Sequence, residues 1–127
     1  MSNIATMISQ SHKLVELGLD PNTADMYYPY FGAGQYGDTP RVGFPIEYSG
    51  GRDIPAWSLT ALLEVMPQEN EPELVKSVAS GQYFVHGYFD LEKPTYMTKD
   101  YASPVDAAYE MVCWLLEQGL IKKGGNQ

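Results

Sequence analysis

Cysteine, histidine and basic residues are scarce in this chain of 127 residues. The single cysteine, Cys113, cannot form a disulfide within the chain, which is typical of proteins in a reducing compartment. Eight lysines and arginines stand against 16 aspartates and glutamates, which gives a formal net charge of −8. Nucleic-acid binding depends on basic side chains that neutralise phosphates, so direct nucleic-acid binding is not expected. Attraction to an anionic membrane surface is disfavoured for the same reason.

Long apolar runs are also missing. No stretch approaches the ~20 apolar residues that a membrane-spanning helix requires, and the first six residues lack the basic start of a secretory leader. We therefore expect a soluble, cytoplasmic protein without a membrane segment. Its length and its hydrophobic content of 44% fit one folded domain. We expect that domain over residues 1–123 and a flexible tail over 124–127.

Two segments in the first half of the chain show the hydrophobic period of a helix. Apolar residues recur at helical spacing over 4–17, and Gly18 then stands where a left-handed C-terminal cap is favoured. The spacing returns over 54–66, where Pro55 suits a first helical turn and Pro67 stops the helix. Both segments are predicted to be helices.

A third helix is predicted near the C-terminal end. Ser103 stands at a capping position, Pro104 at the first helical position and Asp106 three residues after the cap. A broad apolar stripe follows, and Gly119 stands at a favourable C-cap position. We therefore expect the Ser103 hydroxyl to cap this helix.

In the segment between the second and third predicted helices, apolar and polar residues alternate as in β-strands. Residues 74–79 and 82–90 read as strands joined by a tight turn at Ser80-Gly81, and 95–99 as a short third strand. Residues 20–53 combine many glycines and prolines with many aromatics, which predicts an ordered loop packed on the core. Within that loop, 41–48 is a candidate edge strand.

Amphipathic helices and a half-apolar sheet have to bury their apolar sides against one another. We therefore predict an α+β fold, with about three helices packed on one face of a small antiparallel β-meander of three to four strands. The predicted order is α-loop/β-α-β-β-β-α.

One stretch matches a cofactor-binding pattern. Gly32, Gly34 and Gly37 fit G-x-G-x-x-G, the fingerprint of dinucleotide-binding loops. Dinucleotide binding by this fingerprint needs a buried strand before the glycines and a helix after them, because the N-terminus of that helix holds the pyrophosphate. No helical pattern follows Gly37, so the glycines are better explained by a turning loop, and no cofactor is expected.

Catalytic and metal-binding arrangements are not apparent. His12, His86 and Cys113 are the good nitrogen and sulfur ligands, and they fall in three different predicted elements. A packing or hydrogen-bonding role is expected for His86, and a buried apolar role for Cys113. Glu47 and Asp53 remain a remote alternative for acid–base chemistry. The acidic connector around Glu69, Glu71 and Glu73 reads as solvated.

Tyrosine is the anomaly of the composition, with ten copies among 127 residues. A tyrosine offers a large rigid contact area with a polar tip, which suits recognition surfaces. The alternative is that tyrosines cover sheet faces and pack a loop onto the core. The candidate interaction surface consists of Tyr27, Tyr28, Tyr30, Tyr36, Tyr83 and Tyr88.

Two helical stretches carry a resemblance. They are IPAWSLTALLEVMP at 54–67 and SPVDAAYEMVCWLLEQGLIKK at 103–123. With the hairpin between them, they resemble uncharacterised small proteins encoded in prophage-like and mobile-element regions of gut bacteria. The resemblance implies a phage or mobile-element origin and brings no known catalytic residues.

The expected function is that of a non-enzymatic interaction or accessory protein, which binds a protein partner through a tyrosine-rich loop and sheet surface. Two alternatives stay open. One is a small-ligand binder or unrecognised enzyme with a pocket between residues 27–53 and the sheet. The other is a structural subunit that associates with copies of itself.

Overall fold

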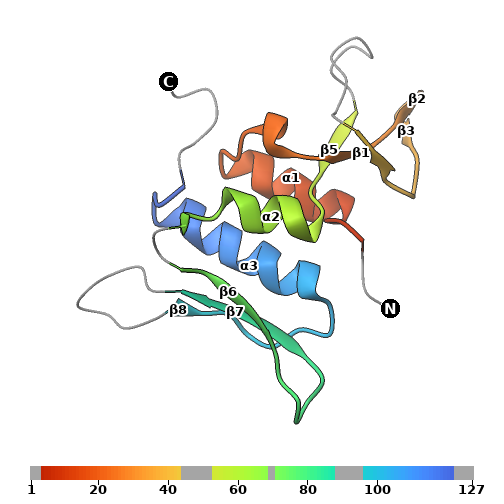
Figure 1. Cartoon of the computed structure of the whole chain (residues 1–127). Coiled ribbons are helices and arrows are strands. Elements are labelled where there is room, and N and C mark those ends of the chain that lie inside the picture. The colour runs from red at the N-terminus through yellow and green to blue at the C-terminus, as the bar shows by residue number, and fades with distance from the viewer. Residues whose placement is uncertain (1–3, 44–52, 69–70, 88–95, 122–127) are drawn as a thin grey trace.

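The computed structural model describes residues 4–43, 53–68, 71–87 and 96–121 (Figure 1). Within these ranges three helices accompany three small antiparallel sheets, so the chain is an α+β protein, as the sequence predicts. The elements in chain order are α1 (Ile8–Glu16), the 3-10 turn η1 (Pro21–Thr23), β1 (Met26–Tyr28), β2 (Tyr30–Gly32), β3 (Gln35–Tyr36), β4 (Arg41–Val42), β5 (Ile54–Ala56), α2 (Leu59–Val65), β6 (Glu73–Lys76), β7 (Tyr83–Gly87), β8 (Tyr96–Met97) and α3 (Pro104–Glu117). None of the helices in the described ranges is long and apolar enough to cross a bilayer.

The predicted meander is the sheet β6-β7-β8, in which both strand pairs are antiparallel. β6 and β7 run from the pair Glu73–His86 to the pair Lys76–Tyr83. The connection between them is longer than the predicted two-residue turn at Ser80-Gly81. It follows one more hydrogen bond after the last strand pair, in which Ser77 N–H donates to Gln82 O at 2.7 Å. The connection from β7 to β8 lies outside the described residues.

The segment 20–53 contains more regular structure than the sequence indicates. β1 lies in the centre of a second sheet, β4-β1-β5, and β2 and β3 form a separate hairpin. Of the candidate edge strand 41–48, Arg41 and Val42 form β4, and residues 44–48 lie outside the described residues. These strands are two or three residues long, too short for an alternating pattern to be recognised in the sequence.

The prediction of one helix over 54–66 is wrong at its start. Residues 54–56 form β5, which pairs with β1, and α2 begins only after Ser58. Pro55 is tolerated there because β5 is an edge strand, where an N–H group need not join a ladder. Ser58 caps α2, since its Oγ accepts the Ala61 N–H at 3.2 Å.

The other two helices follow their predicted patterns with two corrections. Gly18 and Gly119 both have left-handed backbone, with φ of +103° and +74°, as the C-cap prediction requires. α1 begins at Ile8 rather than at residue 4. The Ser103 hydroxyl, expected to cap α3, makes no capping hydrogen bond and is buried without a partner among the described residues.

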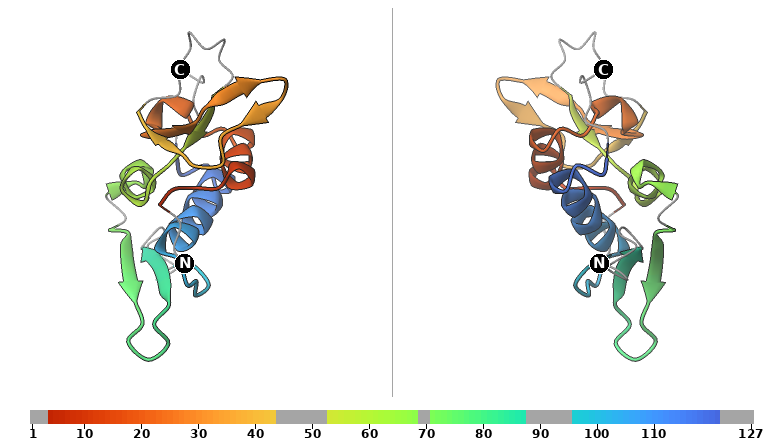
Figure 2. Two further views of the ribbon diagram at one scale, coloured as in Figure 1. Left: turned by 90° about the vertical axis from the view of Figure 1, so that its right-hand side faces the viewer. Right: turned by 90° about the vertical axis from the view of Figure 1, so that its left-hand side faces the viewer.

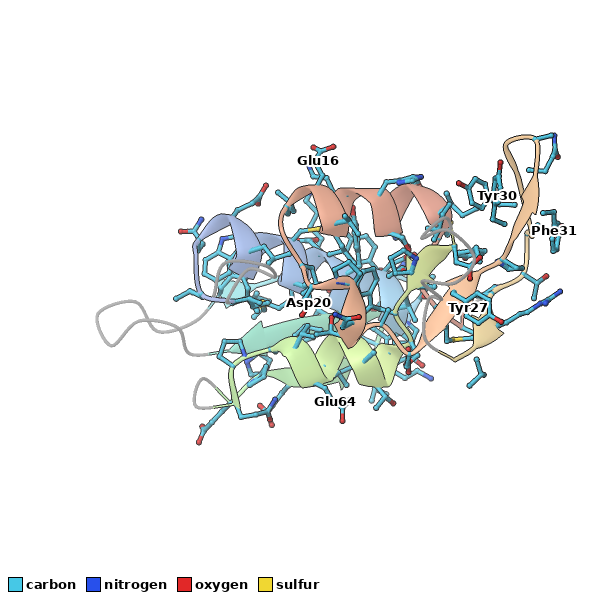
Figure 3. All side chains as sticks on the ribbon, turned by 90° about the horizontal axis from the view of Figure 1, so that it is seen from above. Glu16, Asp20, Tyr27, Tyr30, Phe31 and Glu64 are labelled. Atoms are coloured by element: carbon cyan, nitrogen blue, oxygen red, sulfur yellow. The ribbon has the colours of Figure 1, made fainter. Side chains whose placement is uncertain are left out.

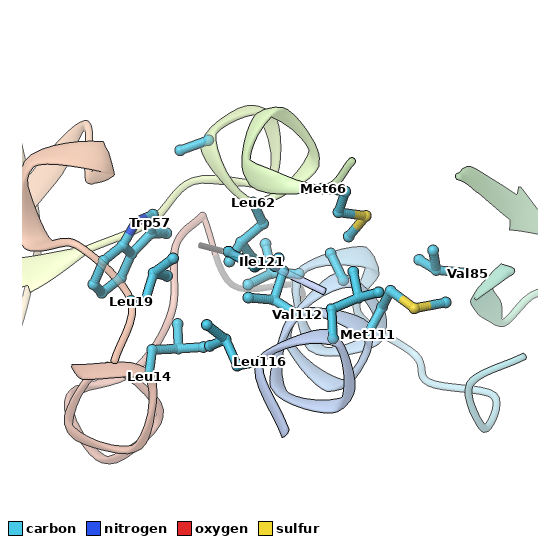
Figure 4. Close-up of a cluster of buried hydrophobic side chains, with 14 of the residues drawn as sticks. Leu14, Leu19, Trp57, Leu62, Met66, Val85, Met111, Val112, Leu116 and Ile121 are labelled. Atoms are coloured by element: carbon cyan, nitrogen blue, oxygen red, sulfur yellow. The ribbon is translucent and has the colours of Figure 1, made fainter. Parts of the chain in front are cut away.

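The helices occupy the middle of the molecule, and the two three-stranded sheets lie at opposite ends (Figure 2). α3 packs on β7 of the meander and on α1 and α2, so it is the meander's main helical neighbour. Its buried stripe joins Trp57, Leu62 and Leu14 in the main hydrophobic core (Figure 4). A smaller apolar cluster, which includes Met26 and Ala56, lies between α1 and the sheet β4-β1-β5.

A buried polar network joins these two parts of the core. Thr6 N–H donates to Trp57 O at 2.9 Å, and Trp57 N–H donates to Thr6 Oγ1 at 3.1 Å. The Thr6 and Ser11 hydroxyls lie 2.8 Å apart. The Trp57 indole N–H donates to Thr23 Oγ1 at 2.9 Å. These bonds satisfy buried polar groups and fix the entry to α1 against β5.

Candidate functional site

Residues 27–42 project from the helices as a segment that we call the aromatic arm (Figures 1 and 3). The arm contains the β2–β3 hairpin, whose turn runs through Gly32, Ala33 and Gly34 at φ of +96°, +55° and +75°. Three successive left-handed residues explain why glycine is needed here, since side chains rarely adopt this conformation. The G-x-G-x-x-G run is therefore a hairpin turn between two strands, and lacks the strand-to-helix geometry of a dinucleotide fingerprint.

Tyr30 and Tyr36 stabilise the hairpin from one face. They are cross-strand partners, and their ring centroids lie 5.1 Å apart with the planes tilted by 56°. The Tyr30 hydroxyl accepts the Gly34 N–H at 3.1 Å, and the Tyr30 N–H donates to the Asp53 carboxylate at 3.0 Å. The arm is therefore held in a defined shape by its own aromatic side chains, and anchored to the start of β5.

Three apolar or aromatic side chains of the arm are exposed to solvent. Phe31 is 61% exposed, Val42 is 84% exposed and Tyr36 is 37% exposed. The Arg41 guanidinium lies 5.8 Å from the centre of the Phe31 ring, within the range of a cation–π contact. The arm thus presents two exposed aromatic rings, an aliphatic side chain and an arginine within 12 residues.

The structure separates the described tyrosines of the predicted surface. Tyr27, Tyr30 and Tyr36 lie on the arm, and Tyr27 is half-buried opposite Arg41. Tyr83 lies on β7 at the other end of the molecule, half-buried against the main core, with Lys76 Nζ 5.7 Å from its ring centre. Tyr88 lies outside the described residues.

Tyr28 does not belong to an exposed surface. It is 6% exposed in the smaller apolar cluster, and its hydroxyl donates to Thr6 O at 2.8 Å. Burial also raises the pKa of this phenol. Since β1 alternates buried and half-buried positions, Tyr28 points into the core while its neighbour Tyr27 points away from it. We remove Tyr28 from the candidate surface.

Among the other residues considered for chemistry, His86 and Asp53 have structural partners. His86 Nε2 lies 3.2 Å from Glu73 Oε1, across the β6–β7 ladder. Burial raises the pKa of the Cys113 thiol, which opposes formation of a reactive thiolate at neutral pH. Asp53 is buried and accepts the Tyr30 N–H, while Glu47 lies outside the described residues. In the ranges that the structure describes, no three His, Cys, Asp or Glu side chains gather as a metal site.

One polar cluster could not be found from the sequence. Glu110 on α3 accepts hydrogen bonds from the Tyr101 hydroxyl at 2.7 Å, the Tyr96 hydroxyl at 3.1 Å and the Lys99 N–H at 3.3 Å. The Tyr96 ring also stacks on Trp114 with centroids 3.9 Å apart. The residues of this Glu110 cluster come from β8, the following loop and α3, so their contacts hold β8 against α3.

A groove along α2 was also not apparent from the sequence. Three open hollows adjoin there, and Glu64 lines all of them. Their other walls come from η1, from Leu19 and from Leu120-Ile121, which are far apart in the chain. The hollows lie along α2 and η1, and are not the pocket expected between residues 27–53 and the sheet.

Comparison with known proteins gives no relative: no protein-family model, no curated protein and no solved structure matches the chain. What the chain does therefore has to follow from its own surface and geometry.

Proposed function

We propose that this chain is a non-enzymatic interaction module that binds a protein partner through the aromatic arm. The observation that carries the proposal is the exposure of Phe31, Tyr36 and Val42 beside Arg41 on one projecting, internally braced segment. Aromatic residues and arginine dominate the binding energy of protein interfaces, and gathered exposed apolar side chains mark interaction sites.

The charge of the chain favours a protein over a nucleic acid as the partner. A net charge of −8 repels polyanions, and one arginine on the arm cannot neutralise several phosphates. The same charge on every copy also opposes self-association. The resemblance of 54–67 and 103–123 to prophage-encoded small proteins favours a phage or host protein as the partner. The single cysteine fits a cytoplasmic location.

Paired variants test the proposal. Phe31→Ser/Val42→Ser removes two exposed apolar side chains from the arm. Val78→Ser/Met97→Ser removes two from the other end of the molecule, where Val78 is 98% exposed between β6 and β7. Each variant is used as bait in a lysate of the encoding cells, after circular dichroism has shown that it is folded.

The proposal predicts a protein that the wild type and the Val78/Met97 variant capture equally, and that the Phe31/Val42 variant loses at least tenfold, as expected for hot-spot truncations. Equal capture by all three chains, or no capture by any, contradicts it. Light scattering of the wild type distinguishes the homo-oligomer: a mass of several chains that the arm variant reduces to one would identify a second copy as the occupant.

A further inference from the structure

The exposed side of α2 carries an open groove that is separate from the aromatic arm. We call it the acidic groove, and define it by Leu19, Asp20, Asp25, Glu64, Val65 and Leu120. Two of its hollows have volumes of about 380 Å³ each and the third has about 520 Å³. Asp20, which precedes η1, and Glu64 on α2 line the same hollow, and both are labelled in Figure 3.

The floor of the groove is apolar. Leu19 and Ile121 lie at its base, while Val65 and Leu120 are partly accessible beside them. Leu120 is 39% exposed although it follows the buried helix α3. An aliphatic side chain seated here would therefore bury apolar surface on both partners, which is favourable in water.

The described walls of the groove carry negative charge. Asp20, Asp25 and Glu64 line it, and no lysine, arginine or histidine is among the described residues that line the three hollows. Asp25 is engaged, because Ser58 N–H and Ser58 Oγ both donate to its carboxylate. Asp20 uses one oxygen to accept the Asn22 N–H, and Glu64 forms no ion pair with a described residue.

We propose that the acidic groove docks a short basic and apolar segment of a partner protein. A lysine or arginine of that segment would lie between Asp20 and Glu64, and a neighbouring aliphatic side chain would cover Val65 and Leu120. The groove is open along its length, so a small molecule would stay largely in solvent, whereas typical ligand pockets bury most of their ligand. The net charge of −8 further favours approach of a basic segment. This inference does not depend on the function of the arm.

The probe is a fluorescent synthetic peptide of about twelve residues, three turns of helix, with leucine on one face and lysine beside it. Its matched control replaces each lysine by glutamate. Fluorescence anisotropy with the full chain should show saturable binding of the lysine peptide, weakened by salt because exposed charges are screened within ~10 Å at 0.1 M. The glutamate peptide should not bind.

Charge variants locate the binding. Asp20→Asn/Glu64→Gln removes both charges and keeps a capping oxygen at position 20, and it should weaken binding roughly three- to thirtyfold, as expected for two exposed pairs. Glu16→Gln/Asp100→Asn removes two exposed charges outside both the groove and the arm and should leave the affinity within about twofold. Equal weakening by both double variants would mean attraction to the overall charge only, and would overturn the proposal.

Two further chains complete the test. Leu120→Asn should weaken binding of the peptide through loss of apolar contact, and unchanged affinity would contradict docking on the floor. Lys122→Gln/Lys123→Gln addresses the chain's own lysines, which follow Ile121 in the sequence. Unchanged affinity supports an external partner, while a gain of tenfold or more would identify these lysines as the occupant and overturn the proposal. All of these chains keep the arm intact, so failure here leaves the proposed function standing.

Discussion

Gln10 on α1 donates from its side-chain nitrogen to the Asp106 carboxylate on α3 at 2.9 Å, although 96 residues separate them. The oxygen of the same side-chain amide, Gln10 Oε1, accepts the Met7 N–H at 2.8 Å at the start of α1. Gln10 is nearly buried, and Asp106 lies in the first turn of α3, where negative charge is favoured. One amide therefore caps the first helix and joins it to the last.

Gln10→Glu should destabilise the protein by about 1–3 kcal/mol at neutral pH, because it removes the donor and sets two carboxylates against each other. Gln10→Ala should cost about 1–2 kcal/mol through the lost bonds alone. Urea denaturation at neutral and acidic pH separates the two effects. The excess cost of the glutamate should shrink in acid, where protonation removes the repulsion, and an excess that is independent of pH would contradict this account.

The two serines that precede α2 and α3 should respond in opposite ways to alanine. Ser58→Ala removes a cap and the hydroxyl that donates to Asp25, and should cost about 1–2 kcal/mol. Ser103→Ala removes a buried hydroxyl without a partner, and should be neutral or slightly stabilising. Thermal unfolding of both variants measures the difference, and a larger loss for Ser103→Ala would show that its hydroxyl has a partner in solution.

The tyrosines bound to Glu110 should lose their stabilising contribution at high pH. Burial, then the hydrogen bond and charge of Glu110, raise the pKa of both Tyr96 and Tyr101 from 10.0 to about 12. A raised folded-state pKa favours the protonated form, so the contribution is complete below pH 10 and disappears as the pH rises from 10 towards 12. Denaturation across this window should show the loss.

Tyrosinate absorbance, compared between the wild type and the Tyr96→Phe and Tyr101→Phe variants, measures the two phenols directly. Glu110→Gln should lower both pKa values without returning them to 10.0, since burial is the larger cause. Titration of both phenols near 10.0 in the folded wild type would contradict the described environment of Glu110.

The sequence predicted the fold correctly where a periodic pattern of apolar residues continues over many residues. The stripe of α3 is 14 residues long, and the meander alternates over two strands, so both were recognisable. Strand β1 has three residues and pairs with β5 some 28 residues later, so nothing local reveals it. Pro55 predicted a helix start because proline is common in the first turn of helices. Proline is also tolerated in an edge strand, but the edge position of β5 follows only from its pairing with β1 in the sheet.

The sequence indicated which segment carries the candidate site, but not which of its side chains are exposed. The density of tyrosine between 27 and 36 indicated the aromatic arm, but burial of Tyr28 beside half-buried Tyr27 depends on a strand too short to recognise. Phe31 and Val42 were missed because exposure of an apolar side chain leaves no mark in the sequence. The acidic groove brings together three distant segments, around residues 19–25, 60–68 and 120–121.

The central claim is that the aromatic arm contacts a protein partner, and site-specific photo-crosslinking in the encoding cells tests it most directly. A photoreactive phenylalanine analogue is placed at Phe31 in one chain and at Val78 in another, since both side chains are exposed. Phe31 lies on β2 and Val78 between β6 and β7, and these elements lie at opposite ends of the molecule (Figure 1). We predict a discrete crosslinked protein from position 31, absent from position 78 and lost when Val42→Ser is added. A position 31 that yields no crosslink, or the same products as position 78, would contradict the claim.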